Sequence, residues 1–306
     1  MAKCHAAAPL PMRDGVAPSY LWLPEGQWPD MLTFLIERYP QIGAAQWLDR
    51  MARGEVLNGD GAVLGPGSAY KRGMRIFYYR ELERETPIPF QEEILFQDEH
   101  LIVVDKPHFL PMTPAGRFLQ ETLLTRLKKN LDCAELTPIH RLDRETAGVV
   151  IFSRQVASRG AYQTLFQRRE VRKTYEALAP HLDGCDFPFT YRSRMVEGAQ
   201  FFLMREEAGE ANSETIIDVI ERRGEVNLYR LQPHTGRKHQ LRVHLASLGI
   251  PIVNDAFYPL AQQCKEDDMS HPLQLLARAI DFTDPLSGEP RHFESRRSLE
   301  AQALIV

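Results

Sequence analysis

A short charged stretch near the middle of the chain lies directly before an apolar one. The sequence HRLDRETAG, which begins at His140, places Asp143 and Glu145 beside two arginines just ahead of AGVVIF. The apolar run predicts a buried strand, so a carboxylate in the loop before it would be held on a rigid element and could face a cleft. Asp143 is the leading candidate for a catalytic carboxylate. Glu145 competes with it, and a structural ion-pair loop is the alternative.

The second candidate segment is PHTGRKHQLRVHLASLGIPIVND. Gly236 permits a tight turn after a strand, and Arg237 and Lys238 are expected to begin a helix. Arg242 lies between apolar neighbours on that helix, so we expect a buried guanidinium that needs an anionic partner. A bidentate pair with a catalytic carboxylate would meet that need. The histidines of this segment are five residues apart rather than four, which argues against a helical metal pair.

Local charge also bears on function, although the net charge of −4 does not suggest a nucleic-acid-binding protein. Basic residues gather in residues 154–173 and 222–244, which adjoin or contain the candidate segments. Tyr175 follows the first of these clusters in the strand KTYEALA. It is either ordinary sheet packing or, beside a basic cleft, a residue that stacks on a base or transfers a proton. Lys106 and Pro107 end another apolar strand and predict nothing alone.

Length and composition bound the class of protein. The chain of 306 residues has the composition of an ordinary globular protein and predicts a large domain with a smaller one. Its N-terminal apolar run is too short for a signal peptide, and no segment reaches the roughly 18 apolar residues of a membrane span. Its four cysteines have no paired CxxC spacing, so neither a zinc site nor a redox couple is expected. We therefore expect a cytoplasmic protein with no membrane partner.

Changes in pattern divide the chain into four parts. Residues 1–27 are expected to form a flexible arm, and residues 28–83 a small module with helix, turn and strand signals. Residues 84–93 are a polar, proline-containing linker, and residues 94–306 form the larger domain. Its helices are expected within 118–130, 155–169 and 239–249. Several adjacent strands with a few interspersed helices predict an α+β domain with a large mixed or antiparallel sheet.

Taken together, HRLDRETAG, the tyrosine of KTYEALA and PHTGRKHQLRVHLASLGIPIVND resemble the RluA-type RNA pseudouridine synthases in order and spacing. DKPHFLPMTP resembles the lysine-proline motif of that family, and the resemblance covers about residues 91–290. It implies a pseudouridine synthase fold with a mixed, largely antiparallel sheet and flanking helices. It further implies an isomerase that detaches uracil from ribose, rotates it and rejoins it through carbon 5. Structured ribosomal or transfer RNA is the expected partner, with no metal and no organic cofactor.

The resemblance also implies roles for individual residues. Asp143 is the catalytic aspartate, which either attacks the anomeric carbon or takes a proton from the ribose. Tyr175 packs on the target base, and Arg242 is the salt-bridge partner of Asp143. Leu241 lines the pocket, and Arg141 enters the RNA stack when the uridine flips out, which extrusion of a base requires. Further substrate contacts are expected from Lys106, His140, Arg144, Arg237 and Lys238.

The sequence departs from the family pattern at three places. His108 and Phe109 replace the usual glycine after the lysine-proline pair, Thr113-Pro114 stands where many members have His-Pro, and Asn254 stands where glycine is common. These departures put the choice of substrate in doubt more than the activity.

The N-terminal module and two other functions complete the set of expectations. The module weakly resembles the alpha-L RNA-binding fold of ribosomal small-subunit protein four, but Arg50, Arg53, Lys71 and Arg72 are few cations for RNA binding, and a structural appendage is the alternative.

A catalytically inactive RNA-binding or RNA-folding protein with the same fold is one alternative function of the chain. A glycoside hydrolase that uses Asp143 and Glu145 is another. We expect a monomer.

Overall fold

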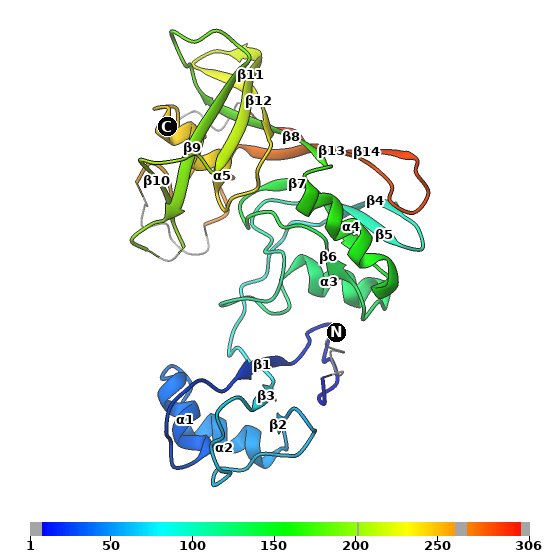
Figure 1. The fold of residues 1–306 in the computed structure, drawn as a ribbon, viewed down its shortest axis with the longest axis vertical. Helices are drawn as coiled ribbons and strands as arrows, with labels where there is room; N and C mark the ends of the chain where they lie inside the picture. Colours follow the sequence, from blue (N-terminus) through cyan, green and yellow to red (C-terminus); the bar gives the residue numbers. More distant parts are fainter. Residues whose placement is uncertain (1–7, 201, 261–267, 301–306) are drawn as a thin grey trace. The chain divides into compact units, whose positions relative to one another are not determined.

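The computed structural model describes residues 8–200, 202–260 and 268–300 (Figure 1). The chain forms two compact units: the first is Met1–Glu85 with Gly116–Gln120, and the second is Thr86–Ala115 with Glu121–Val306. The boundary after residue 85 falls inside the predicted linker, whereas the return of residues 116–120 to the first unit has no signal in the sequence. Within the described residues, no helix is long and apolar enough to cross a membrane.

The first unit packs two helices against one face of a three-stranded antiparallel sheet. Asp30 caps the first helix, since its carboxylate accepts a hydrogen bond from the backbone N–H of Thr33 at 2.8 Å. Trp47 of the second helix is fully buried, with its ring 5.4 Å from that of Tyr78 on the sheet. In chain order the elements are β1 (Ser19–Trp22), α1 (Met31–Arg38), α2 (Ala44–Ala52), β2 (Val56–Asn58) and β3 (Arg75–Tyr78), with the strands in the order β1-β3-β2.

Strand β1 corrects one expectation. The sequence predicts a flexible arm over residues 1–27, yet Ser19–Trp22 pairs along its whole length with Arg75–Tyr78. Leu21 on this strand packs against the helices, so the strand is part of the core. A strand of four residues between two prolines gives too short a pattern to recognise from sequence. Residues 1–7 lie outside the described part of the chain.

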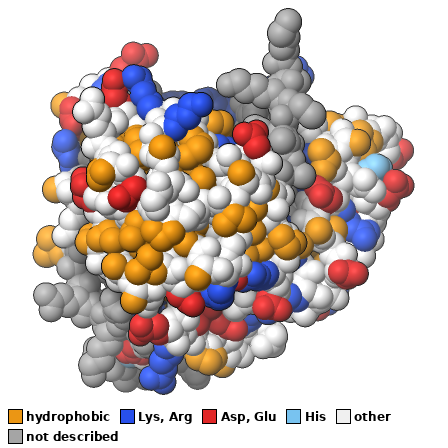
Figure 2. Space-filling model, turned by 90° about the horizontal axis from the view of Figure 1, so that it is seen from below, with side chains coloured by type: hydrophobic (Ala, Val, Ile, Leu, Met, Phe, Trp, Pro, Cys, Tyr) orange, Lys and Arg blue, Asp and Glu red, His pale blue; other side chains and the backbone are white. Residues whose placement is uncertain are grey.

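The surface carries hydrophobic side chains beside charged ones. Figure 2 shows one face on which hydrophobic side chains form a broad area bordered by Lys, Arg, Asp and Glu. Cys133 and Cys185 carry free thiols, while Cys4 and Cys264 lie outside the described residues. The large hydrophobic side chains of the first unit that are at least 42% exposed are Tyr20, Trp22, Leu48 and Val63.

The second unit is built on an eleven-stranded sheet, which confirms the predicted α+β fold with a mixed, largely antiparallel sheet (Figure 1). The strands run in the order β10-β9-β11-β12-β8-β13-β7-β5-β4, with β14 beside β13 and β6 beside β7. Their bounds are β4 (Glu93–Gln97), β5 (Leu101–Lys106), β6 (Thr137–Pro138), β7 (Ala147–Ser153), β8 (Arg172–Pro180), β9 (Phe189–Glu197), β10 (Met204–Glu207), β11 (Ser213–Arg223), β12 (Val226–Pro233), β13 (Leu275–Thr283) and β14 (Pro290–Glu294).

Three helices belong to this unit: α3 (Leu123–Leu131), α4 (Val156–Arg168) and α5 (Gln240–Ser247). Helix α5 begins three residues later than the expected start at Arg237, because His239 has a φ of 55°, which is incompatible with a right-handed helix. Gly249 follows its end with a φ of 81°, as expected for a glycine that terminates a helix. The helices are thus close to the predicted segments, and their ends differ where the backbone turns left-handed.

The strand after HRLDRETAG is held by a close parallel pairing. Strand β13 pairs with β7 in parallel, with Leu276 opposite Ala147 and Ala277 opposite Gly148. Gly148 has a φ of 114°, and a Cβ placed there would lie 2.2 Å from the carbonyl oxygen of Ala277. The glycine of the motif is therefore required by this contact, which fixes the end of the charged loop on the sheet.

Candidate active site

The loop that carries Asp143 is fixed at both ends. Its last turn is closed by a hydrogen bond from the backbone N–H of Thr146 to the carbonyl of Asp143 at 3.2 Å, and β7 beyond it is buried at every residue. His140 holds the start: its Nε2 accepts from the backbone N–H of Ile151 at 3.2 Å, and its ring stacks on Phe166. Burial lowers the pKa of His140 to about 3, so the ring is neutral and acts as an acceptor. His140 therefore supports the loop.

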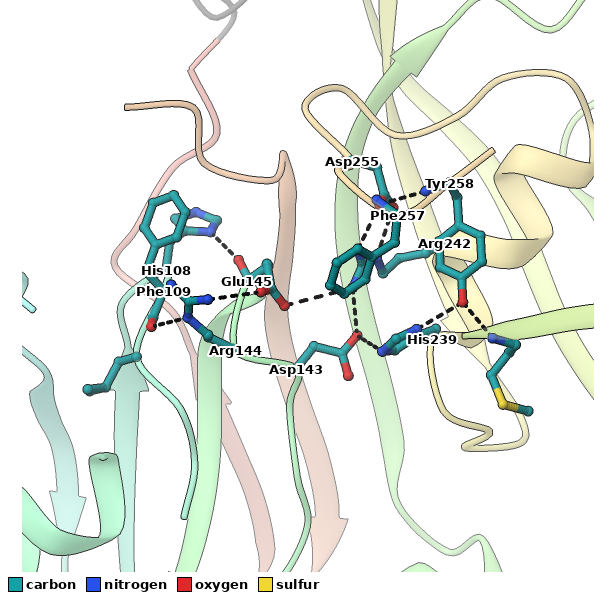
Figure 3. A network of polar contacts seen from close by, with 12 residues as sticks. His108, Phe109, Asp143, Arg144, Glu145, His239, Arg242, Asp255, Phe257 and Tyr258 are labelled. Atoms are coloured by element: carbon teal, nitrogen blue, oxygen red, sulfur yellow. Dashed lines mark hydrogen bonds and ion pairs between the residues drawn. The ribbon is translucent and has the colours of Figure 1, made fainter. Parts of the chain in front are cut away.

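Arg242 is buried, as the sequence predicts, but its bidentate partner is Asp255 (Figure 3). Its Nε and Nη2 donate to the two oxygens of Asp255 at 2.8 and 2.7 Å. Its Nη1 lies 3.4 Å from Oδ2 of Asp143 and 3.9 Å from Oε2 of Glu145. The expected ion pair with Asp143 is present, whereas the expected bidentate geometry is wrong, because Asp255 occupies the planar fork of the guanidinium.

Asp255 is a residue that reasoning from sequence missed. Its side chain is 1% exposed, and besides Arg242 it accepts hydrogen bonds from the backbone N–H groups of Phe257 and Tyr258 at 2.8 and 3.2 Å. Asn254 before it has a φ of 61°, a conformation that glycine and asparagine adopt readily. The departure at Asn254 therefore keeps the turn that presents Asp255 to Arg242. The signal available in the sequence was that Asp255 directly follows the apolar stretch IPIVN and has no lysine or arginine close to it in the chain.

Three carboxylates surround the single guanidinium of Arg242. Burial by itself lowers the pKa of Arg242, but the hydrogen bonds and charge of Asp255, then the charges of Asp143 and Glu145, outweigh burial and raise the pKa above its ordinary value. The guanidinium carbon also lies 4.8 Å from the ring centroid of Phe257, within the range of a cation–π contact. Arg242 therefore remains charged, and one of its amino groups faces Asp143.

Lys106 corrects another expectation, since it cannot contact RNA. Its side chain is fully buried, and its Nζ donates to the carbonyls of Pro107, Leu110 and Arg144 at 3.0, 2.8 and 3.0 Å. An ammonium group has three donors, so all of them are used. Burial lowers the pKa of Lys106 to about 7, against the opposing charges of Glu145 and Asp143. The lysine holds the backbone of the loop instead of a substrate.

Arg144 also lies away from the expected substrate contact. Its Nε donates to the carbonyl of Phe109 at 3.1 Å, and Figure 3 shows its side chain beside His108 and Phe109. His108 contacts the carbonyl of Glu145 through Nδ1 at 2.6 Å, and Phe109 has a φ of 66°. The positive φ explains why glycine suits this place in the family. The departure at His108 and Phe109 therefore adds contacts with Arg144 and Glu145 of the charged loop.

A cavity of about 640 Å³ opens beside Asp143, within the range of roughly 300–1,000 Å³ found for small-ligand sites. Tyr175 and Leu241 form part of its wall, and Arg141 is exposed at it. Burial, with a contribution from the charge of Asp143, raises the pKa of Tyr175, so its phenol keeps its proton at neutral pH. Within the described residues, Asp143 is the one carboxylate on this wall. The structure thus brings Asp143, Tyr175, Leu241 and Arg141, which were predicted as site residues, to one cavity.

Comparisons with known proteins identify the family. A model of the RNA pseudouridylate synthase family matches residues 100–247. The dual-specificity RNA pseudouridine synthase RluA of Yersinia pestis is 34% identical over 217 residues, which are 66% of this chain and 97% of that protein. The chain belongs to the RluA-type RNA pseudouridine synthases. A protein of Synechocystis named as an uncharacterized RNA pseudouridine synthase is 29% identical over 233 residues, covering 74% of this synthase and 79% of that protein.

Solved structures agree with this assignment. Human RNA pseudouridylate synthase domain containing 4 matches 69% of the synthase and 90% of its own chain, with a TM-score of 0.52 and 27% identity. The synthase is therefore an isomerase that converts uridine to pseudouridine in RNA, which confirms the predicted activity.

Three cations line the cavity in the synthase besides those already described. Arg169, Lys173 and Arg237 line it, whereas the exposed Lys238 does not. Lys173 donates to the carbonyl of Thr235 at 3.3 Å, and burial, together with the charge of Arg169, lowers its pKa. Of the two expected contacts on the segment before α5, only Arg237 reaches the cavity. Arg169 and Lys173 come from the basic cluster at residues 154–173, which the sequence pointed to only as a group.

His239 is the second residue that the sequence reasoning missed. Its Nε2 lies 3.8 Å from Oδ2 of Asp143, and its Nδ1 is 2.9 Å from the hydroxyl of Tyr258 (Figure 3). That hydroxyl accepts from the backbone N–H of Met204, so its own proton is free to go to Nδ1. Burial lowers the pKa of His239, with the charge of Asp143 opposing, so the ring is neutral. The hydrogen bonds assign the ring proton to Nε2, which faces the synthase's carboxylate.

Gln240 fixes the turn before α5. Its Oε1 accepts from the hydroxyl of Thr235 at 2.6 Å and from the backbone N–H of Arg237 at 3.1 Å, and its Nε2 donates to the carbonyl of Glu214 at 3.0 Å. The side chain therefore ties the turn to strand β11. Because Gln240 is the first residue of α5, this tie fixes the start of the helix from which the buried Arg242 reaches the synthase's site.

Proposed function

We propose that Asp143 is the essential catalytic group with which the synthase isomerises a specific uridine in structured ribosomal or transfer RNA. The observation that carries the proposal is that Asp143 is the one carboxylate on the cavity wall among the described residues, with a charged Arg242 3.4 Å behind it. A hydrolytic glycosidase needs two acids across the bond that it cleaves. Glu145 does not line the cavity, so the arrangement favours isomerisation over hydrolysis.

The isomerisation is balanced without a co-reactant. The bond from N1 of uracil to C1′ of ribose breaks, the base rotates, and C5 forms the new bond to C1′. C5 then loses its proton and N1 gains one. Asp143 acts on the ribose, and Arg242 pairs with its carboxylate and directs it into the cavity. Because both fragments stay in one cavity, a single carboxylate is sufficient.

Three residues are proposed to hold the flipped nucleotide. Tyr175 and Leu241 offer an aromatic and an aliphatic surface for the base, and the phenol of Tyr175, which keeps its proton, stacks on it. Arg141 fills the space that the uridine leaves in the RNA helix, since a guanidinium can stack and also pair with phosphate. Arg169, Lys173 and Arg237 bind the backbone beside the flipped base.

The wider setting is also a proposal. The synthase works as a monomer in the cytoplasm, where ribosomal and transfer RNA are found. Residues 94–306 supply the catalytic domain, 84–93 a linker and 28–83 an RNA-binding module, which Ser19–Trp22 extends.

Replacement of Asp143 by Asn tests the catalytic role. The amide has the shape of the carboxylate but no charge, so pseudouridine formation should fall below detection while RNA affinity stays within about twofold. Chemical labelling of pseudouridine across total RNA, compared between the parent strain, a deletion strain and a strain that carries only D143N, measures the first effect. A single site missing from the deletion strain would identify the substrate.

Glu145→Gln is the matched control, because it removes a carboxylate two residues away that is also near Arg242. It should keep product formation within about tenfold of the parent, since Glu145 does not line the cavity. If D143N retained every pseudouridine, the catalytic assignment would be wrong. Loss of product with E145Q and not with D143N would transfer the role to Glu145. A deletion strain with unaltered labelling would favour an inactive RNA-binding protein.

A further inference from the structure

Two aromatic rings lie exposed on the edge strand of the first unit. Tyr20 and Trp22 are two residues apart on β1, so both point to the same face of the sheet, and each is 57% exposed. The side chain between them, Leu21, points to the other face and packs against the helices. Single exposed hydrophobic residues are common, but two large rings side by side on one strand are not explained by the fold.

Arg75 joins the two rings into one surface. The register pairs it with Trp22, and its guanidinium carbon lies 4.3 Å from the ring centroid of Tyr20 and 5.6 Å from that of Trp22. Beneath it, the centroid of Phe77 is 4.5 Å away. Within the described residues no carboxylate pairs with Arg75, and its Nε is shielded from solvent without a hydrogen-bond partner. The charge at this place is therefore not matched by the protein.

Further cations lie at the end of the same strand. The backbone of Leu23, just after β1, exchanges hydrogen bonds of 2.9 Å with Gly73 and Met74, which places the loop that contains Lys71 and Arg72 beside it. Both of these side chains are exposed, and Arg72 pairs with Glu25 at 2.7 Å. Together with Arg75, the loop adds positive charge next to the exposed rings.

We propose that Tyr20, Trp22 and Arg75 form a platform on which unpaired bases of the substrate RNA stack. Exposed rings beside Arg75, which no acid of the described residues matches, suit single-stranded RNA, because bases stack on the rings and phosphates pair with the guanidinium. An apolar protein partner would leave Arg75 buried and unpaired, which is costly. This inference rests on RNA as the substrate, as in the proposed function, and it adds a second RNA contact outside the catalytic cavity.

Binding of a single-stranded oligonucleotide tests the platform. The full chain is titrated into a fluorescein-labelled, unstructured RNA 12-mer in the D143N background, so that no turnover is needed and a failure of the catalytic assignment does not affect the result. Tyr20→Ala combined with Trp22→Ala should weaken binding by at least about tenfold, because each base stacked on an aromatic ring contributes roughly 1–3 kcal/mol. Tyr20→Phe combined with Trp22→Phe should stay within about twofold, because the rings remain.

The matched control is Leu48→Ala combined with Val63→Ala, which removes two exposed hydrophobic side chains of the same unit that are 42% and 58% exposed. It should leave the affinity unchanged. Tryptophan fluorescence gives an independent readout: RNA should quench it in the D143N chain, and the quenching should disappear in the Trp22→Phe version although binding persists. Of the other two tryptophans, Trp47 is fully buried and gives no such signal, whereas Trp28 is only partly buried, so both proteins of this comparison also carry Trp28→Phe.

Unchanged affinity in the double alanine variant would overturn the proposal. So would quenching that survives Trp22→Phe, or an equal loss of affinity in the Leu48 and Val63 control. Thermal unfolding of each variant checks the fold, and a lower affinity counts in favour only if the unfolding temperature is kept.

Discussion

Lys106 and Arg242 both bury a cation beside the loop that carries Asp143, but different partners hold them. Lys106, at the end of β5, donates to three backbone carbonyls. Arg242, on α5, is paired with Asp255 and also faces Asp143 and Glu145. Burial lowers the pKa of the lysine to about 7, whereas the carboxylates raise that of the arginine.

The difference separates two tasks. Neutral carbonyls only partly replace water around an ammonium, so Lys106 loses its proton readily, and what it holds is the backbone at Arg144. Carboxylates keep Arg242 charged throughout the pH range in which proteins are stable, so the electrostatic partner of Asp143 does not vary. One buried cation therefore fixes the course of the loop, and the other sets the charge at its catalytic residue.

Arg242→Met removes the cation that three carboxylates share, and it should have the largest effect. Asp255 would remain 1% exposed without its cation, and breaking a buried pair in this way costs about 3–5 kcal/mol of unfolding free energy. Turnover should fall at least about a hundredfold, since Asp143 would lose its orientation. Urea denaturation and labelling of pseudouridine in the isolated RNA substrate measure the two effects.

Arg242→Lys is the control, because it keeps the charge but cannot bond both oxygens of Asp255 at once. It should recover part of the stability and little of the turnover. Full turnover in the lysine variant would show that charge alone matters, and near-normal turnover in the methionine variant would remove Arg242 from the site altogether.

Lys106→Met tests the hydrogen bonds from the lysine to three backbone carbonyls. It leaves three buried carbonyls without donors, so we expect a loss of about 1–3 kcal/mol in unfolding free energy at pH 10, where the wild-type lysine carries little charge. A lysine whose pKa is lowered to about 7 in the folded state binds fewer protons there than in the unfolded chain between pH 7 and its ordinary pKa near 10.5. Wild-type stability should therefore rise with pH across this window by up to about 1.4 kcal/mol per pH unit, and the methionine variant should lack that contribution.

Urea denaturation of both proteins at several pH values gives the difference, from which groups common to both cancel. The stability of wild type relative to K106M should rise by roughly 3 kcal/mol from pH 7 to pH 10, so the advantage of wild type at pH 10 should vanish or reverse at pH 7. A gap that stays constant would mean that the ammonium keeps its proton, and the contrast with Arg242 would then be lost.

Much of the fold and part of the site could be predicted from sequence. Apolar runs such as 147–153 and the glycine after α5 gave their elements directly, because periodicity and turn chemistry are local. Strand β1 was missed, since four residues between prolines carry too little pattern. Helix α5 was started too early, because the left-handed backbone at His239 has no sequence signature.

The site shows the same division between local and distant signals. Asp143 and Arg242 were recognised from their own neighbours and from the order of motifs. Asp255 was not, since the pairing of an acid with a guanidinium thirteen residues away depends on how the turn at Asn254 folds back. Lys106 was assigned to RNA through the resemblance of its motif to the family, and only the tertiary structure shows that it is buried and donates to three carbonyls.

The smallest expected effect on turnover comes from replacing His239. Besides the charged Arg242, this neutral histidine also faces Asp143. His239→Asn tolerates the backbone φ of 55° and removes the ring whose Nε2 lies 3.8 Å from the carboxylate. A separation of 3.8 Å is too long for a hydrogen bond, so we expect the ring to orient Asp143 only where this contact shortens with RNA bound. We expect kcat to fall by about two- to tenfold, the size of one hydrogen bond, with KM unchanged. Tyr258→Phe should have a similar effect, because the hydroxyl that orients the ring is lost. A hundredfold loss in either variant would place His239 beside Arg242 as an equal partner of Asp143, and it would mean that charge pairing alone does not set the geometry of the carboxylate.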